Sequence, residues 1–185
     1  MIEIISGTNR PDSQTRKMAN LILALYQAQG TPARILDLVD MPAEVFAPTA
    51  YATKPAAFAP LANRILACDG MHVVVPEYNG SYPGVLKYFI DMLKFPESFE
   101  HRPVAYVGVS AGIWGAFRAV EQLQMVFGYR NAYALPERVW VAGIHKKWNA
   151  DFSALTDDLA MTLLKDQAKR FAAFCDLHKG EVAKG

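Results

Sequence analysis

Short apolar runs alternate with amphipathic stretches along the whole chain, as in proteins built from repeated β-strand and α-helix units. The apolar runs predict strands over residues 2–6, 33–38, 71–76 and 104–109. The run 71–76 is β-branched at its centre, which favours a central parallel strand covered on both faces, whereas 33–38 alternates enough to favour an edge strand. Apolar positions at helical spacing predict helices over 13–29, 61–68, 85–93, 116–127 and 153–177.

Two stretches leave the choice of element more open. Residues 41–60 hold four prolines, so we expect a loop with one broken helix there. Residues 131–135 predict a short fifth strand, which residues 138–143 either extend or follow as a separate hairpin. The chain has no internal repeat, low-complexity tract or linker, so residues 1–185 should form a single domain. Five strands with crossover helices predict an α/β fold, a three-layer sandwich around a parallel sheet.

Composition and charge narrow the class of protein. Of the 185 residues, 52% are hydrophobic and 20% are charged, which is typical of a soluble α/β protein and not of a disordered chain. The 19 basic and 18 acidic residues nearly balance, so no overall field draws the chain to nucleic acid or to an anionic membrane. Residues 1–6 lack the features of a signal peptide, and the uncharged run 103–117 is too short to span a bilayer. We therefore expect a cytoplasmic protein that binds neither nucleic acid nor membrane.

The residue types that most often ligate metals form no recognisable site. Cys68 and Cys175 are far apart in the sequence and should be buried free thiols. The four histidines match no metal-ligand spacing, so no metal site is predicted. His72 falls in a buried strand and should be a hydrogen-bonded core residue. The segment 145–148, His-Lys-Lys-Trp, is typical of a solvated loop.

Three polar or glycine-rich segments follow the first, third and fourth predicted strands. Ligands of open parallel sheets bind beyond the carboxyl ends of the strands, so these segments are the candidate site. The first, residues 6–15, brings hydroxyls and a guanidinium beside a helix N-terminus, where free N–H groups favour a phosphate: Thr8, Ser13, Thr15 and Arg10. The alternative is that Ser13 only caps the helix and that the rest is a hydrophilic turn.

The other two segments offer mainly backbone groups. Residues 76–84 run from a strongly apolar strand directly into a polar turn, which exposes several N–H groups at the edge of the sheet. In residues 110–115, glycines let the backbone approach a planar ligand closely.

The segment 76–87, Pro-Glu-Tyr-Asn-Gly-Ser-Tyr-Pro-Gly-Val-Leu-Lys, resembles the signature of the NADPH-dependent FMN reductases, a family of flavodoxin-like quinone, azo and chromate reductases. The first segment is similar to the family's first loop, though more loosely, and residues 110–115 are similar to its third loop. The resemblance covers residues 1–136. It implies a flavodoxin-like fold with a five-stranded parallel sheet in the order 2-1-3-4-5, with FMN as cofactor and NADPH or NADH as substrate.

The resemblance also implies roles for individual residues. The FMN phosphate would be held by Thr8, Arg10, Ser13 and Thr15. The isoalloxazine would be lined, chiefly through main-chain groups, by Pro76, Glu77, Tyr78, Asn79 and Gly80, and its pyrimidine side would be closed by Ser110, Gly112 and Gly115. Thr8 and Thr15 stand where the family usually has Ser and Asn, and both keep a side chain that can form hydrogen bonds.

The chemistry that the resemblance implies belongs to flavin N5, and no catalytic side chain is predicted. The expected reaction is ping-pong: NAD(P)H reduces the flavin and leaves, and a quinone, a free flavin or a similar small acceptor then takes the same face. Two alternatives bind flavin without nicotinamide-dependent turnover, namely a flavodoxin-type electron carrier and a flavin-binding sensor. Such carriers are typically strongly acidic, so the balanced charge of this chain argues against one.

A homodimer or homotetramer is also expected. The helix 85–93 carries more large apolar groups than one sheet face needs, with Tyr88, Phe89 and Met92 as the expected excess, and an exposed patch of that kind marks an interface. Dimers of the family pack through this helix and through the helix after the fourth strand, which is 116–127 here.

Overall fold

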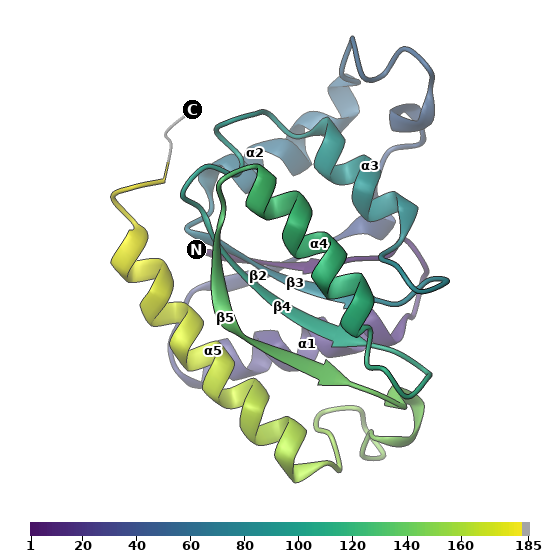
Figure 1. The fold of residues 1–185 in the computed structure, drawn as a ribbon, viewed down its shortest axis with the longest axis vertical. Helices are drawn as coiled ribbons and strands as arrows, with labels where there is room; N and C mark the ends of the chain where they lie inside the picture. The colour runs from purple at the N-terminus through teal and green to yellow at the C-terminus, as the bar shows by residue number, and fades with distance from the viewer. Residues whose placement is uncertain (183–185) are drawn as a thin grey trace.

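The computed structural model describes residues 1–182, and its centre is a five-stranded parallel sheet (Figure 1). The strands are β1 (Ile2–Ser6), β2 (Ala33–Asp37), β3 (Gly70–Pro76), β4 (Pro103–Val109) and β5 (Tyr133–Val141), and they lie in the order β2-β1-β3-β4-β5. This is the predicted order. Strands β3 and β4 are buried at every position, whereas β2 lies at the edge, as the alternation of its sequence indicated.

Helices cover both faces of the sheet and confirm the three-layer sandwich (Figure 1). One face is covered by α1 (Gln14–Ala28) and α5 (Asp158–His178), and the other by α2 (Ala59–Ala67), α3 (Gly84–Met92) and α4 (Phe117–Tyr129). Strands β1, β3 and β4 therefore send alternate side chains into two separate cores, whereas the buried side chains of β5 all join the core beneath α1 and α5. Among residues 1–182, no helix is both long enough and apolar enough to cross a membrane.

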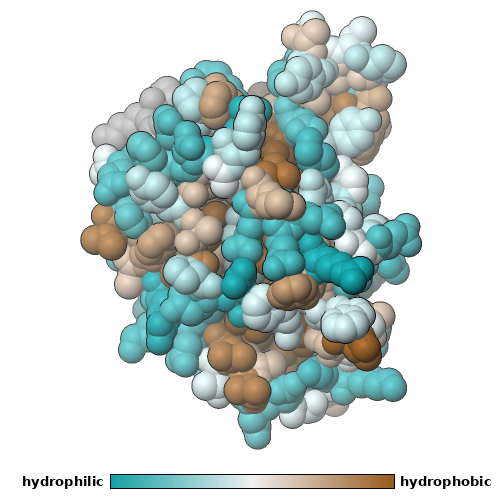
Figure 2. All heavy atoms as spheres, in the orientation of Figure 1, coloured by the Kyte–Doolittle hydropathy of each residue, from teal (hydrophilic) through white to brown (hydrophobic). Residues whose placement is uncertain are grey.

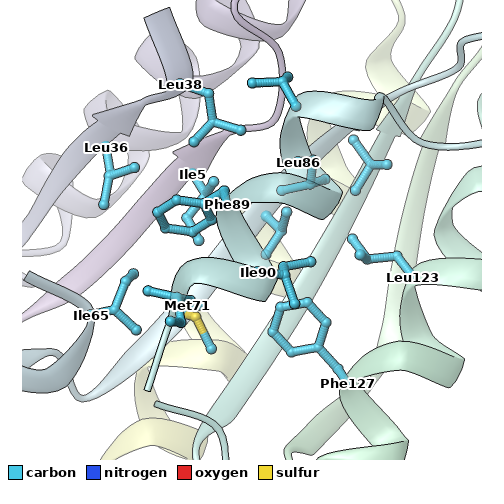
Figure 3. Close-up of a cluster of buried hydrophobic side chains, with 14 of the residues drawn as sticks. Ile5, Leu36, Leu38, Ile65, Met71, Leu86, Phe89, Ile90, Leu123 and Phe127 are labelled. Atoms are coloured by element: carbon cyan, nitrogen blue, oxygen red, sulfur yellow. The ribbon is translucent and has the colours of Figure 1, made fainter. Parts of the chain in front are cut away.

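The core beneath α2, α3 and α4 holds most of the large aliphatic and aromatic side chains (Figure 3). Ile5 and Met71 rise from the sheet into this layer, and Leu86, Phe89 and Phe127 descend from the helices to meet them. All five are almost completely buried. The burial of each large apolar side chain stabilises the folded state by about 1.5–3 kcal/mol. The packed core therefore holds the strand ends in place without disulfides.

The core beneath α1 and α5 contains a buried polar network centred on His72 of β3. Its Nδ1 lies 2.8 Å from the Tyr26 hydroxyl, and its Nε2 lies 3.1 Å from Oε1 of Gln167. The Gln167 amide nitrogen donates to the carbonyls of Tyr106 and Glu137, so its oxygen is the acceptor and His72 Nε2 is the donor. Burial lowers the pKa of His72 to about 4, so the ring is neutral at neutral pH, and both of its nitrogens are hydrogen-bonded, which confirms the expectation of a satisfied core residue.

Both cysteines are buried free thiols, also as expected. Burial raises the pKa of the Cys68 thiol to about 11 and raises that of Cys175 well above its usual range. A thiol with a raised pKa carries little thiolate at neutral pH, so both residues act as small apolar side chains.

The structure resolves the open choice at residues 131–143. One strand, β5, runs from Tyr133 to Val141, and its register against β4 shifts between Val104 and Tyr106. The extra residues on β5 include Pro136, which has no N–H to donate to the ladder. A bulge of this kind separates two apolar runs that belong to one strand.

Two further element boundaries differ from the predictions. The last helix begins at Asp158 and not near residue 153, because the Asp157 side chain accepts from the Ala160 N–H and caps the helix there. The proline-rich stretch 41–60 contains 3₁₀ turns at Ala43–Phe46 and Ala56–Phe58 in place of a broken helix, and a further 3₁₀ turn, Leu38–Asp40, precedes it.

The predicted apolar excess on the helix 85–93 is wrong for two of its three residues. Phe89 and Met92 point into the core and are 1% and 4% exposed. Tyr88 is 44% exposed, and its ring lies 4.8 Å from that of Phe46 in the preceding loop. Helix α3 packs between the sheet and the loop 38–46, so more of its circumference is buried than a helix on one sheet face would need.

Candidate functional site

The first loop leaves β1 at Gly7, where the backbone passes close to β3. The Gly7 N–H donates to the Val74 carbonyl at 3.0 Å, and a Cβ on Gly7 would lie 2.5 Å from that oxygen and 3.3 Å from Cδ2 of Leu86. Only glycine fits there without displacing the strand end, so Gly7 determines how closely the loop approaches β3.

The loop ends at the N-terminus of α1, where Ser13 is the N-cap residue. Its hydroxyl accepts from the Arg16 N–H at 3.1 Å, so Ser13 does cap the helix, as the alternative interpretation held. Thr15 is buried in the first turn, where backbone N–H groups have no partner within the helix. This arrangement of free N–H groups and hydroxyls suits an anion.

A hydrogen bond between side chains joins the first loop to the second. The hydroxyl oxygens of Thr8 and Tyr78 lie 2.7 Å apart, and Thr8 is 1% exposed. The second loop is itself a tight turn, in which Tyr78 and Ser81 exchange backbone hydrogen bonds of 2.8 and 3.1 Å. Its central residues, Asn79 and Gly80, both have positive φ, the conformation that an Asn-Gly pair favours.

The third loop follows β4 and is held at its base by β5. The Ser110 N–H donates to the Val141 carbonyl at 3.1 Å, and the Ser110 hydroxyl donates to the Gly112 carbonyl at 3.0 Å. Gly115 has a φ of +60°, and a Cβ there would lie 2.8 Å from Cβ of Trp140. Gly115 therefore lets the loop pack on β5, while the loop tip presents Ile113 and Trp114 to solvent at 80% and 67% exposure.

The three loops surround one cavity of about 170 Å³ at the carboxyl ends of the strands. Among the predicted site residues, the cavity is lined by Thr8, Arg10, Ser13, Thr15, Pro76, Glu77, Tyr78 and Ser110. The structure does not bring Asn79, Gly80, Gly112 and Gly115 into this lining. These four residues shape the turns of the second and third loops, and their role toward the flavin ring stays a prediction.

The cavity also has lining residues that the sequence analysis did not select. Asp12, Gln14, Val109 and Ala111 are neighbours of selected residues. Ile144 and His145, by contrast, come from the turn after β5. No motif marks that turn. The rule that ligands gather at strand ends would have found it only if the end of β5 had been known.

The chemistry of the lining fits the phosphate end of FMN. Arg10 supplies a guanidinium that makes no ion pair among residues 1–182, and the hydroxyls and the first turn of α1 supply further donors. Pockets that enclose a whole drug-sized ligand are about 300–1,000 Å³, so this cavity can take the phosphate and part of the ribityl chain but not the ring as well. The ring would then lie outside, between the second and third loops.

A larger hollow of about 730 Å³ lies between the ends of α3 and α4 (Figure 2). Its lining is mostly apolar and aromatic, with Ile90 and Phe95 on one side and Met125 and Tyr129 on the other. Tyr82 of the second loop also lines it, so the hollow adjoins the loops that surround the cavity.

Comparisons with known proteins agree with the resemblance. A family model for NADPH-dependent FMN reductases matches residues 1–146. The chain is 29% identical over 181 residues to an NADPH azoreductase from Bacillus sp. (strain OY1-2), covering 98% of this chain and 95% of the relative. It is 27% identical over 188 residues to a quinone reductase from Pseudomonas putida, covering 96% of each. The flavoenzyme NAD(P)H:(acceptor) oxidoreductase FerB from Paracoccus denitrificans has a TM-score of 0.78 at 25% identity, covering 96% of this chain and 97% of that one.

Proposed function

The chain belongs to the NADPH-dependent FMN reductase family, and we propose that it reduces quinones, azo compounds or similar small acceptors by ping-pong turnover over one exposed flavin face. Membership makes it an NAD(P)H-dependent flavin oxidoreductase with FMN as cofactor. The proposal adds where the cofactor lies and how its two substrates share it. The observation that supports it is that three strand-end loops surround one cavity, whose lining offers hydrogen-bond donors for an anion.

The residues of the chain bind and orient the cofactor. Arg10 and the hydroxyls of Ser13 and Thr15 would hold the phosphate at the start of α1, where the helix dipole also favours negative charge. The Thr8–Tyr78 hydrogen bond fixes the second loop against the first, so that both are in place before the cofactor binds. When bound, FMN supplies the redox chemistry, taking a hydride from the nicotinamide and passing electrons to the acceptor.

The third loop provides backbone N–H groups for the flavin's pyrimidine edge. Residues 111–114 are exposed and protrude beyond the buried strand β4. Donors at that edge stabilise negative charge on the ring, which is where charge develops during reduction. Trp114 lies at the loop tip and would stand beside the ring face that remains open.

A shared face explains both the ping-pong order and a broad choice of acceptor. With the phosphate in the cavity, the loops would hold the cofactor along its phosphate, ribityl and pyrimidine edges, and one ring face would remain for nicotinamide or acceptor but not for both. Stacking against aromatic side chains discriminates less between ligands than directed hydrogen bonds do. The names of the azoreductase and quinone reductase relatives are consistent with acceptors of different chemistry.

Steady-state kinetics test this proposal. Initial rates measured at several NADPH and quinone concentrations should give parallel double-reciprocal lines. Anaerobic mixing of the FMN-loaded protein with NADPH alone should bleach the flavin without any acceptor present. Intersecting lines would show a ternary complex and refute the shared face. A flavin that neither NADPH nor NADH bleaches would favour the electron carrier.

We also propose that the active unit is a homodimer formed through α3 and α4. The hollow between these helices is flanked by exposed apolar side chains, with Met125 68% and Tyr129 79% exposed. Large exposed apolar groups around a hollow mark a protein interface more often than a solvated surface. Because Tyr82 lines the same hollow, a second copy seated there would lie next to the second flavin loop.

A further inference from the structure

The turn that follows β5, residues 143–148, contributes Ile144 and His145 to the lining of the phosphate cavity. Neither residue belongs to the three loops that carry the family resemblance. Ile144 is buried, whereas the side chain of His145 is exposed. An exposed side chain on the wall of an anion cavity is free to turn toward a ligand.

Hydrogen bonds tie this turn to the third flavin loop. The Gly143 N–H donates to the Gly112 carbonyl, and the Ile144 N–H donates to the Ser110 carbonyl, each at 3.0 Å. These two hydrogen bonds fix the backbone immediately before His145 against the loop that follows β4. A ligand that contacts Ser110 and Ala111 would therefore lie in the cavity that His145 also lines.

The other end of the turn is tied to the phosphate loop. The indole N–H of Trp148 donates to Oε1 of Gln14, the first residue of α1, at 2.6 Å. Gln14 itself lines the cavity. The turn that carries His145 is thus hydrogen-bonded to the third loop before this residue and to Gln14 after it. These contacts within the chain fix the position of this part of the cavity wall.

The basic neighbours of His145 are differently placed. Lys147 pairs with Asp157 at 2.5 Å, and this hydrogen bond lowers the pKa of the Asp157 carboxyl. Lys146 is exposed and does not line the cavity. Of the basic side chains in the turn, only that of His145 belongs to the cavity wall, which it shares with Arg10.

We propose that His145 is a ligand of the FMN phosphate and donates a ring N–H to a phosphate oxygen, as a fourth element of the binding site. The imidazole carries an N–H donor in both its neutral and its protonated form, so the contact does not require a particular charge state. The proposal rests on the proposed function, because it needs the cofactor's phosphate to lie in this cavity. It also gives the segment 145–148 a role that its sequence did not indicate.

Binding measurements on the apoprotein test the proposal with FMN and with riboflavin, which has the same ring and ribityl chain but no phosphate. Calorimetric titration should show that His145→Ala raises the Kd for FMN about tenfold, the value of one hydrogen bond to a charged group. The same variant should leave the Kd for riboflavin unchanged. His145→Gln, which keeps a donor, should recover most of the affinity for FMN.

Lys146→Ala is the matched control, because it removes a basic side chain from the same turn without touching the cavity wall. At roughly 0.15 M salt the screening length is about 8 Å, so a general loss of positive charge should have little effect. An unchanged FMN affinity in His145→Ala, or an equal loss for riboflavin, would overturn the proposal. A wild-type protein that binds FMN no better than riboflavin would overturn the phosphate placement and this proposal with it. A preference for FMN over riboflavin that is as large in His145→Ala as in the wild type would overturn this proposal alone.

Discussion

Acidification should destabilise the fold through His72, far from the flavin site. Burial lowers the pKa of His72 from 6.5 to about 4, against a smaller raising effect of its hydrogen bond to Gln167. The folded state therefore holds the neutral imidazole, while the unfolded chain takes up a proton near pH 6.5. The resulting stability is fully present above pH 6.5 and is lost as the pH falls toward 4.

The size of the effect follows from the difference between the two pKa values. Each pKa unit corresponds to about 1.4 kcal/mol, so lowering the pKa of His72 from 6.5 to about 4 removes about 3 kcal/mol of stability in the acid limit, most of it by pH 4.5. The cause is burial, because a protonated imidazole would lose its hydration inside the core and no acidic side chain among residues 1–182 is hydrogen-bonded to the ring.

Urea unfolding at several pH values between 8 and 4.5 measures this directly. His72→Gln is the matched variant, because its amide can accept from Tyr26 and donate to Gln167 but does not titrate. The wild type should lose about 2–3 kcal/mol more than the variant over this range. Carboxylates titrate equally in both proteins and cancel in the difference. Parallel stability curves for the two proteins would refute the reasoning.

Three further predictions concern the site and the assembly. Arg10→Ala should weaken FMN binding by about 1.5 kcal/mol while leaving riboflavin binding and the unfolding midpoint unchanged, and equal losses for both ligands in calorimetry would place the phosphate elsewhere. Gly7→Ala should lower the free energy of unfolding in urea by about 1–3 kcal/mol, because the added Cβ would collide with a strand carbonyl. Gly84→Ala, whose Cβ would meet nothing within 4 Å, should lower it far less, and equal losses would contradict the steric account. Light scattering at micromolar concentration should give a dimer mass for the wild type and for Leu177→Glu on α5, and a monomer mass for Met125→Asp; a monomeric wild type would remove the proposed interface.

Features that depend on neighbouring residues in the chain were predictable from the sequence. The β-branched centre of β3 and the helical spacing in α1 and α4 are local patterns, and the strands and helices formed where those patterns lie. Ser13 caps α1, and Asn79 and Gly80 form a tight turn, because the side chain or backbone preference of each residue is enough to favour that conformation. The segment 76–87 indicated the family for the same reason, as its residues are contiguous.

Features that depend on what packs against what were decided only by the tertiary structure. Phe89 and Met92 are buried because α3 lies between the sheet and the preceding loop, and helical periodicity does not reveal that second neighbour. The strand β5 continues through Pro136 because β4 offers it a ladder on both sides of the bulge. His145 reaches the cavity because the ends of β4 and β5 lie side by side and bring residues 110 and 144 within hydrogen-bond distance, a proximity that their separation in the sequence conceals.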